Sequence, residues 1–368
     1  MRKSILLFVL LMTACGLVYA GGWSMVDFPQ ISGRWVLTGV DFISPDQGAV
    51  CGMNIADKTG LIYFYEGGGW KEASLPAVSG HWELRRIDLV TESEGWAFGM
   101  DIEGNKGVIL HYSGGSWSKV EVPEVKSDDW VLLGSYFLNK DEGWAAGGSK
   151  SEKGAVVLHY KDGMWTSEGD AELLKGHLLH TVWAFSPTDV WCAGQNEGHF
   201  YTTGLAAFTR PWGTFEIRNN SGSWAKADTP LLMRNFIRKD YYFFDANDGW
   251  SVGFFPLQAF ETQGKIAHWN GKKWAFEKID DSSKNYNLYA AAFSSKDYGW
   301  AVGTDGKRGC GSMYEYNKGK WTLLKEKQMP AAGKNWLLQD IVFDGSKTFW
   351  AVGFDIDSDK GTVLKLEK

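Results

Sequence analysis

The chain has 368 residues, of which 44% are hydrophobic, and a formal net charge of −6. This apolar content excludes a disordered chain and is enough for a large core. The excess of acidic residues, without any basic run, argues against nucleic-acid binding. All-β folds of this length commonly form one domain, which we expect here.

Residues 1–20 read as a secretory signal peptide. Arg2 and Lys3 form its charged start, residues 5–11 its apolar stretch, and residues 18–20 a small-residue cleavage site. No later segment is long and apolar enough to span a bilayer. We therefore expect an exported protein, in the periplasm, secreted or at the cell surface.

An alternative reading treats residues 12–15 as a lipoprotein box with Cys15 as the lipidated residue. Met12 is unusual at the first position of such a box. The first repeat-like strand starts near Trp23, which would leave a tether of roughly 25 Å at most. We therefore favour cleavage after Ala20 over a lipid anchor at Cys15.

A Gly-Trp-Ala-Val-Gly marker and its variants recur through the chain after tight turns, and repetition at a fixed period is typical of repeat folds. The seven copies occupy residues 48–52, 95–99, 143–147, 190–194, 249–253, 299–303 and 349–353.

A second marker is a glycine turn that ends in tryptophan. Its six internal copies end at Trp70, Trp117, Trp165, Trp224, Trp274 and Trp321. The seventh copy is missing after the last Gly-Trp marker, but residues 21–29 match residues 114–123 in type and order. The displaced N-terminal copy therefore predicts that the first strand completes the last repeat.

Within a repeat, alternating residues predict four short strands, as in residues 82–89, 95–99, 107–112 and 117–122. Seven such repeats with a closing N-terminal strand predict an all-β, seven-bladed β-propeller of four-stranded antiparallel blades. We place the propeller at residues 21–368, with blade seven formed by residues 335–368 and 21–33.

The repeats resemble those of bacterial exported β-propellers with Asp-Val-Trp-Ala-Val-Gly sequences. They also resemble the related Ycf48/HCF136-like photosystem II assembly factors, whose repeat runs Trp-x-Leu and then Gly-Trp-Ala-Val-Gly. The glycine turn departs from the second group, since residues 113–117 read Ser-Gly-Gly-Ser-Trp. The aspartate box of sialidase-type (BNR-like) propellers is absent, because Trp300 directly follows Gly299. The resemblance implies a scaffold and no particular activity.

Most of the 20 tryptophans fall at repeat positions, where large aromatics commonly pack blade against blade. Four of them begin the first strand of a repeat, which lines the central channel: Trp35, Trp82, Trp130 and Trp336. We expect inter-blade packing for these four, with a ring at the channel mouth as the alternative. His111, His159 and His268 share one repeat position on different blades, so they cannot converge on a metal.

Long loops between the second and third strands of a blade (B–C loops) are the expected binding surface. Blade four carries an insertion there between Gln195 and Asn219, and blade five has an aromatic segment. The predicted partner-binding residues are Tyr201, Arg210, Trp212, Phe254, Phe255 and Phe260. Aromatic side chains with a few polar groups suit a protein or glycan partner, and packing of a longer loop on its neighbour is the alternative.

The B–C loop of blade seven alternates oxygen ligands before a glycine, at Asp355, Asp357 and Asp359. This pattern gives a calcium site as a weaker hypothesis, because the glycine is one place later than in an EF-hand. We otherwise expect no cofactor. Cys51 and Cys192 are expected to be buried and Cys310 exposed, with no disulfide framework.

No local catalytic motif is present, which favours a non-enzymatic binding or assembly propeller, expected as a monomer. Its partner would be an envelope or secreted protein or a glycan. The alternative is a carbohydrate-active hydrolase or lyase with a carboxylate pair at the channel mouth. Loop position suggests Glu197, Glu261, Asp305 and Asp355 for that pair.

Overall fold

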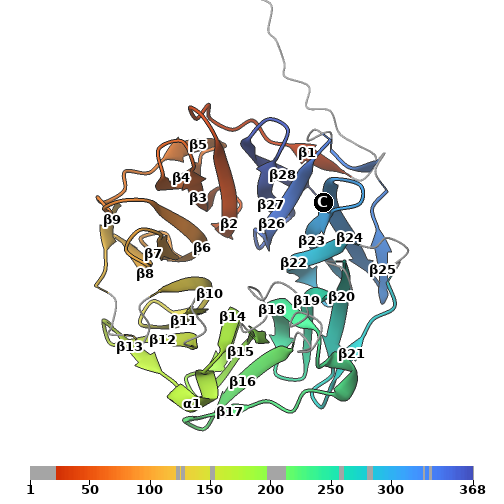
Figure 1. The fold of residues 1–368 in the computed structure, drawn as a ribbon. Coiled ribbons are helices and arrows are strands. Elements are labelled where there is room, and N and C mark those ends of the chain that lie inside the picture. Colours follow the sequence, from red (N-terminus) through yellow and green to blue (C-terminus); the bar gives the residue numbers. More distant parts are fainter. Residues whose placement is uncertain are drawn as a thin grey trace, which may run out of the picture.

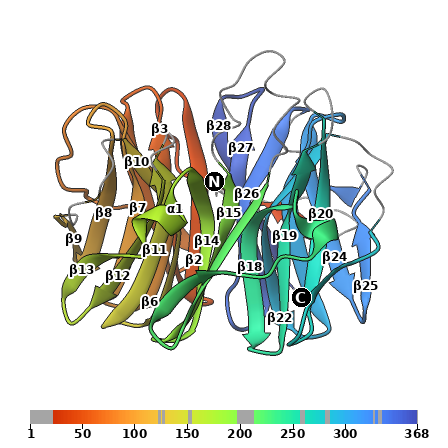
Figure 2. The same ribbon diagram turned by 60° about the horizontal axis from the view of Figure 1, so that its bottom comes forward.

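The computed structural model describes residues 22–121, 125, 129–149, 154–196, 213–256, 261–279, 285–325, 328–330 and 334–367. In this part of the chain, seven four-stranded antiparallel sheets stand around one axis (Figure 1). Figure 2 shows the same sheets turned partly edge-on. The predicted seven-bladed propeller is confirmed.

The four strands of a blade follow one another from the axis to the rim. The innermost strands are β2 (Trp35–Ser44), β6 (Trp82–Thr91), β10 (Trp130–Asn139), β14 (His177–Ser186), β18 (Ile237–Asp245), β22 (Tyr286–Ser295) and β26 (Trp336–Phe343). The second strands are β3 (Gln47–Asn54), β7 (Glu94–Asp101), β11 (Glu142–Ser149), β15 (Asp189–Asn196), β19 (Asp248–Pro256), β23 (Tyr298–Asp305) and β27 (Thr348–Asp355). The third strands are β4 (Thr59–Glu66), β8 (Lys106–Ser113), β12 (Ala155–Lys161), β16 (Thr214–Asn220), β20 (Thr262–Trp269), β24 (Cys310–Asn317) and β28 (Lys360–Glu367). The outer strands are β5 (Gly69–Glu72), β9 (Ser116–Lys119), β13 (Met164–Glu168), β17 (Ser223–Lys226), β21 (Trp274–Phe276), β25 (Lys320–Leu323) and β1 (Trp23–Met25).

Short helical turns lie in some of the described connections between blades. The helix α1 (Ala171–Leu174) lies at the rim between blades three and four (Figure 1). The 3₁₀ turn η2 (Leu231–Met233) lies in the connection from blade four to blade five. No helix in the described ranges is both long and apolar enough to cross a membrane.

The ring is closed by the N-terminal strand, as the displaced repeat predicts. β1 pairs antiparallel with β28, with Trp23 opposite Leu366. The Trp23 side chain is completely buried and meets Trp300 of blade six edge-on, at 5.4 Å between ring centroids. The two ends of the chain therefore share blade seven.

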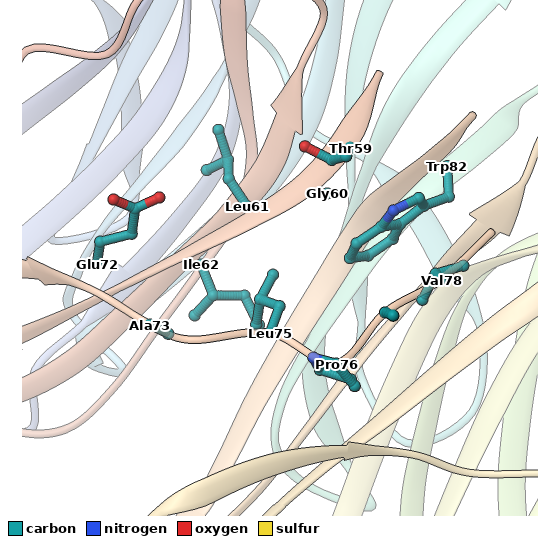
Figure 3. Close-up of a pocket in the computed structure, with 11 residues that line it drawn as sticks. Thr59, Gly60, Leu61, Ile62, Glu72, Ala73, Leu75, Pro76, Val78 and Trp82 are labelled. Carbon is teal, nitrogen blue, oxygen red and sulfur yellow. The ribbon is translucent and has the colours of Figure 1, made fainter. Parts of the chain in front are cut away.

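The tryptophans that begin the innermost strands pack between blades. A Cβ atom added at Gly60 of blade one would lie 2.2 Å from Cζ3 of Trp82 in blade two, and Figure 3 shows this indole ring beside Gly60. The same relation joins Gly107 to Trp130, and Gly361 to Trp35 across the closure. All four tryptophans are buried, which confirms inter-blade packing over a ring at the channel mouth.

The three histidines at one repeat position stay within their own blades. His111 stacks on Trp96 at 3.9 Å and its Nε2 lies 2.7 Å from Glu94. His159 and His268 stack in the same way on Trp144 and Trp250. The expectation that they do not converge is confirmed.

The cysteines Cys51 and Cys192 are buried and free, as expected. The expectation for Cys310 is wrong, because this residue is only 6% exposed. Cys310 is the first residue of β24 and pairs with Asp305, so the strand draws it into the core between blades six and seven. The glycines on both sides of Cys310 made the segment resemble an exposed turn.

Candidate functional site

The connection between blades four and five lies on the face of the propeller that carries the B–C loops. The single hydroxyl proton of Thr214 is shared between the carbonyl oxygens of Met233 and Phe236, which lie 2.6 and 2.5 Å from Oγ1. The amide of Thr214 donates to the carbonyl of Arg234 at 2.6 Å, and Met233, the last residue of η2, has a buried side chain. The base of the blade-four insertion therefore fixes this connection in place.

Two leucines on η2 point away from the protein. Leu231 is 74% exposed and Leu232 is 82% exposed, the two largest exposures among the described large hydrophobic residues. Because hydrogen bonds hold the backbone of the turn, these side chains are presented from a fixed position. We call this pair the leucine turn.

The predicted binding residues of blades four and five are only partly within the described chain. Tyr201, Arg210, Trp212 and Phe260 lie outside the described residues, as does Glu197. Phe254 is buried. Phe255 is half-buried against Phe236 and Phe276, with ring centroids 6.0 and 5.3 Å apart. Among the described residues of this face, the most exposed large hydrophobic side chains are those of the leucine turn, which the sequence did not predict.

A buried ion pair joins blades four and five beneath this face. Nη1 of Arg238 lies 2.8 Å from Oε2 of Glu216, and the two side chains are 0% and 1% exposed. The hydroxyl of Tyr241 donates to the other carboxylate oxygen of Glu216 at 2.7 Å. The guanidinium carbon of Arg238 lies 5.4 Å from the centre of the Phe236 ring and 5.1 Å from that of Trp274.

The acidic loop of blade seven uses its carboxylates within the protein. Asp357 accepts hydrogen bonds from the backbone amides of Lys334 and Asn335 and from the Asn335 side chain, which together lower the pKa of Asp357. Asp355 accepts from the amide of Asp357, and Asp359 pairs with Arg34 at 2.9 Å. No group of three or more His, Cys, Asp or Glu residues in the described ranges is arranged to hold a metal ion. Calcium at this loop stays a prediction.

Each innermost strand contains a bulge at the same place. The bulge leaves one residue without a partner on the second strand, and such an extra residue redirects side chains. The seven unpaired residues are Thr38, Arg85, Leu133, His180, Lys239, Tyr289 and Gln339. All seven are partly exposed although they lie on the innermost strands, so they face the axis. We call them the bulge ring.

Just past the bulge ring, four aspartates link neighbouring blades around the axis. Asp340 accepts from the amide of Val40 at 3.1 Å, and Asp41 accepts from the amide of Leu89 at 2.7 Å. Asp88 accepts from the hydroxyl of Ser135, and Asp240 accepts from the amide of Ala291 at 3.1 Å. These carboxylates connect blade seven to one, one to two, two to three, and five to six.

The aspartates share little compensating charge. Nη1 of Arg86 lies 3.1 Å from Asp340. Burial and the nearby Asp88 raise the pKa of Asp41 to about 7. Burial also raises the pKa of Asp240 to about 7, despite the positive charge of Arg86. At neutral pH the group therefore holds fewer charges than its four carboxylates suggest.

Two cavities are lined in part by residues of the innermost strands. One, of about 570 Å³, lies at the end of the axis where the first and second strands turn, and is lined by Asp41, residues 88–91 and residues 136–140. The other, of about 250 Å³, is a groove beside Trp82 between the start of β4 and residues 73–78 (Figure 3).

The carboxylates at the axis were missed because they stand on strands and not on loops. Aligning the inner strands of the seven repeats would have exposed them.

The seven four-stranded blades and their closure by β1 define a seven-bladed β-propeller. No protein-family model matches the chain, and no curated protein matches it. Several solved structures match the chain in fold. Ycf48 from Cyanidioschyzon merolae is 16% identical with a TM-score of 0.60, over 94% of this chain and 99% of that one. A structure titled Ycf48 bound to D1 peptide is 15% identical with a TM-score of 0.61, over 96% of this chain and 99% of that one.

A GH74 xyloglucanase from Xanthomonas campestris is 12% identical with a TM-score of 0.59. The match covers 92% of this chain and 55% of that one. At such low identities the likenesses show the fold alone. They agree with the Ycf48-like propeller architecture that the repeats predicted.

Proposed function

We propose that this protein is an exported, non-enzymatic binding or assembly propeller that holds a protein partner on its B–C face. The leucine turn carries the proposal. Two leucines exposed on an ordered turn are costly in water and are typical of a protein contact. They follow the blade-four insertion in sequence, and hydrogen bonds from Thr214, at the described end of that insertion, hold their turn.

A protein suits this surface better than a glycan. Leucine side chains provide apolar area but neither a flat aromatic face nor a hydrogen-bonding group for a sugar. One of the solved Ycf48 structures is titled as bound to a peptide, which supports a peptide-binding use of the shared fold. The export signal of residues 1–20 would place the partner in the envelope or outside the cell.

Site-specific crosslinking tests the proposal. A photoreactive amino acid replaces Leu232 in one variant and Met164, which is 66% exposed on the outer strand β13, in a control variant. We expect one envelope protein to crosslink from position 232 and not from position 164. That partner, once purified, should bind the wild-type propeller and lose about tenfold or more in affinity for L231E/L232E, because two buried leucine contacts are lost.

Two results would overturn the proposal. One is the absence of any crosslink specific to position 232. The other is unchanged affinity of the purified partner for L231E/L232E, with M164E as the matched control for an added surface charge.

A carbohydrate-active hydrolase is the second candidate, favoured by one observation. Asp41 and Asp88 both line the 570 Å³ cavity, and the raised pKa of Asp41 suits a general acid. Against it, both oxygens of Asp41 accept backbone hydrogen bonds, from Phe42 and Leu89. We expect the wild-type protein to release no product from soluble glucans and xyloglucan. Release that is abolished in D88N would favour the hydrolase instead.

A further inference from the structure

Lys239 holds the unmatched positive charge of the bulge ring. Arg85, the other full cation of the ring, is neutralised by Glu83, whose Oε1 lies 2.7 Å from Nε and 2.6 Å from Nη2 of Arg85. Lys239 has no carboxylate partner among the described residues. Within the described part of the chain, the one hydrogen-bond partner of its ammonium is the imidazole of His180, at 3.2 and 3.3 Å.

The hydrogen bonds around His180 define its protonation state. Nε2 of His180 lies 3.1 Å from Oε1 of Gln195, so it donates its proton to that carbonyl oxygen. Nδ1 then accepts from the ammonium of Lys239. Burial lowers the pKa of His180 well below its ordinary value, consistent with this neutral form. Lys239 thus keeps two N–H bonds without an acceptor in the described chain.

A second donor beside this site also lacks a partner. Gln195 is 1% exposed, and its Nε2 has no hydrogen-bond partner in the described part of the protein. A buried donor without an acceptor costs free energy, which a bound oxygen ligand would recover. Tyr289, on the strand next to Lys239, adds a neutral hydroxyl to the ring.

Aliphatic residues stand on the inner strands between the B–C face and the bulge ring. Two positions before the bulge residue, nearer the start of each inner strand, five of the seven blades carry an aliphatic side chain. These are Val36, Val131, Leu178, Ile237 and Leu337. Val131 and Ile237 are buried, and we call the three partly exposed side chains of Val36, Leu178 and Leu337 the aliphatic collar. The equivalent residues in the other two blades are Glu83, which is paired with Arg85, and Asn287.

We propose that the bulge ring is a binding site for a small organic carboxylate, whose anionic end meets Lys239 and the Gln195 amide while its apolar body lies against the aliphatic collar. One negative charge matches the one unmatched ammonium. A doubly charged phosphate would leave an excess negative charge close to Asp240 and Asp340. The site uses different residues from the leucine turn, so it goes beyond the protein-binding proposal and stands or falls separately.

Isothermal titration calorimetry with hexanoate at pH 6 tests the site, with hexylamine and hexanamide as cationic and neutral probes of equal length. We expect hexanoate to bind and the amine not to bind. K239M should weaken hexanoate binding about tenfold or more, because a charge-assisted hydrogen bond is lost. K71M removes an exposed lysine on the outer strand β5 and should leave binding unchanged.

The pH dependence provides a test that needs no variant. Burial, together with Arg85, lowers the pKa of Lys239 to about 7, so its charge falls roughly tenfold between pH 6 and pH 8. Asp240, whose pKa is also raised to about 7, gains negative charge over the same range, while His180 stays neutral and Arg86 stays charged. Both changes disfavour an anion, so hexanoate affinity should fall about tenfold or more from pH 6 to pH 8.

The proposal is overturned if hexanoate does not bind, if K239M binds it as well as the wild type, or if hexylamine binds equally. Should K239M fail to fold by circular dichroism, unchanged affinity between pH 6 and pH 8 would overturn it. L231E/L232E should keep full hexanoate affinity. A failure at the leucine turn is thereby distinguished from a failure at the ring.

Discussion

Arg238 and Glu216 form an ion pair across the boundary of two blades, at positions that the other blades fill with apolar residues. By strand register, Arg238 is equivalent to Leu84 of blade two, and Glu216 is equivalent to Ile109 of the same blade. Each charge is fully desolvated and depends on the other. Blades four and five therefore contact each other through a charge pair at positions where blade two has apolar residues.

This dependence predicts a non-additive pair of substitutions. R238L leaves Glu216 buried without its cation and should lower the free energy of unfolding by about 3–5 kcal/mol. The double variant E216I/R238L restores the pattern of blade two and should unfold near the wild-type midpoint or above it. Urea unfolding followed by tryptophan fluorescence measures both. A double variant as unstable as the sum of its single variants would contradict the prediction.

The glycine beneath each inner-strand tryptophan predicts a steric effect. A Cβ atom at Gly107 would lie 2.1 Å from Cζ3 of Trp130, so G107A should destabilise the protein by about 1–3 kcal/mol. Gly69 has no neighbour within 4 Å of the same added atom, and its φ angle is not positive. G69A should therefore be neutral. Thermal unfolding of the two variants side by side tests the contrast.

Removing the Trp23 indole should weaken ring closure. This side chain is fully buried at the blade six and seven boundary, so W23A should cost about 3–5 kcal/mol in the free energy of unfolding. Met25 on the same strand is 41% exposed, and M25A should cost far less. Denaturant titration measures the free energy of unfolding of both variants. Equal losses in W23A and M25A would contradict a specific role of Trp23 in ring closure.

His159 predicts a pH dependence of stability. Burial acts to lower the pKa of His159, but Glu168 and Glu142 hold it above its ordinary value of 6.5. A raised folded-state pKa gives stability that is full below pH 6.5 and lost as the pH rises through the folded value. The stability difference between the wild type and H159Q should therefore be larger at pH 6 than at pH 9. Equal differences at both pH values would contradict the ion-pair assignment.

The leader predicts the start of the mature protein. Cleavage after Ala20 gives a chain that begins at Gly21, one residue before the described structure. Intact-mass spectrometry of the protein from an expressing cell envelope should find this start without a lipid. A mature chain that begins with an acylated Cys15 would instead establish membrane anchoring.

The repeat markers were sufficient to predict the fold because they are the contacts that build it. The positions of Trp82 and Gly60 recur in the repeats because the indole of one blade packs on the glycine of its neighbour. The copy that contains Trp23 stands at the N-terminus because β1 completes the last blade. Cys310 was misplaced because its glycine neighbours suggested a turn. A two-residue motif cannot show that the strand β24 begins there.

The candidate sites were harder to predict because their residues come from different blades and lie close together only in the folded ring. Lys239 and Gln195 stand in different strands, and neither belongs to a local motif. The bulge that turns Lys239 towards the axis follows from pairing with β19, which the alternation of residues does not reveal. The leucine turn was not predicted because Leu231 and Leu232 belong to no repeat marker, and their exposure is evident only from the structure.

The pairing of β1 with β28 sets the order in which the molecule can be completed. Ser24 donates a hydrogen bond to the carbonyl of Lys365, a contact between residues 341 positions apart. Strand β1 is synthesised first but has no partner strand until the last residues have emerged. Loop closure over such a length is slow compared with the formation of hairpins within a blade. Strand β1 therefore stays unpaired until β28 has been synthesised. A chain truncated before β28 would leave the ring open at blade seven.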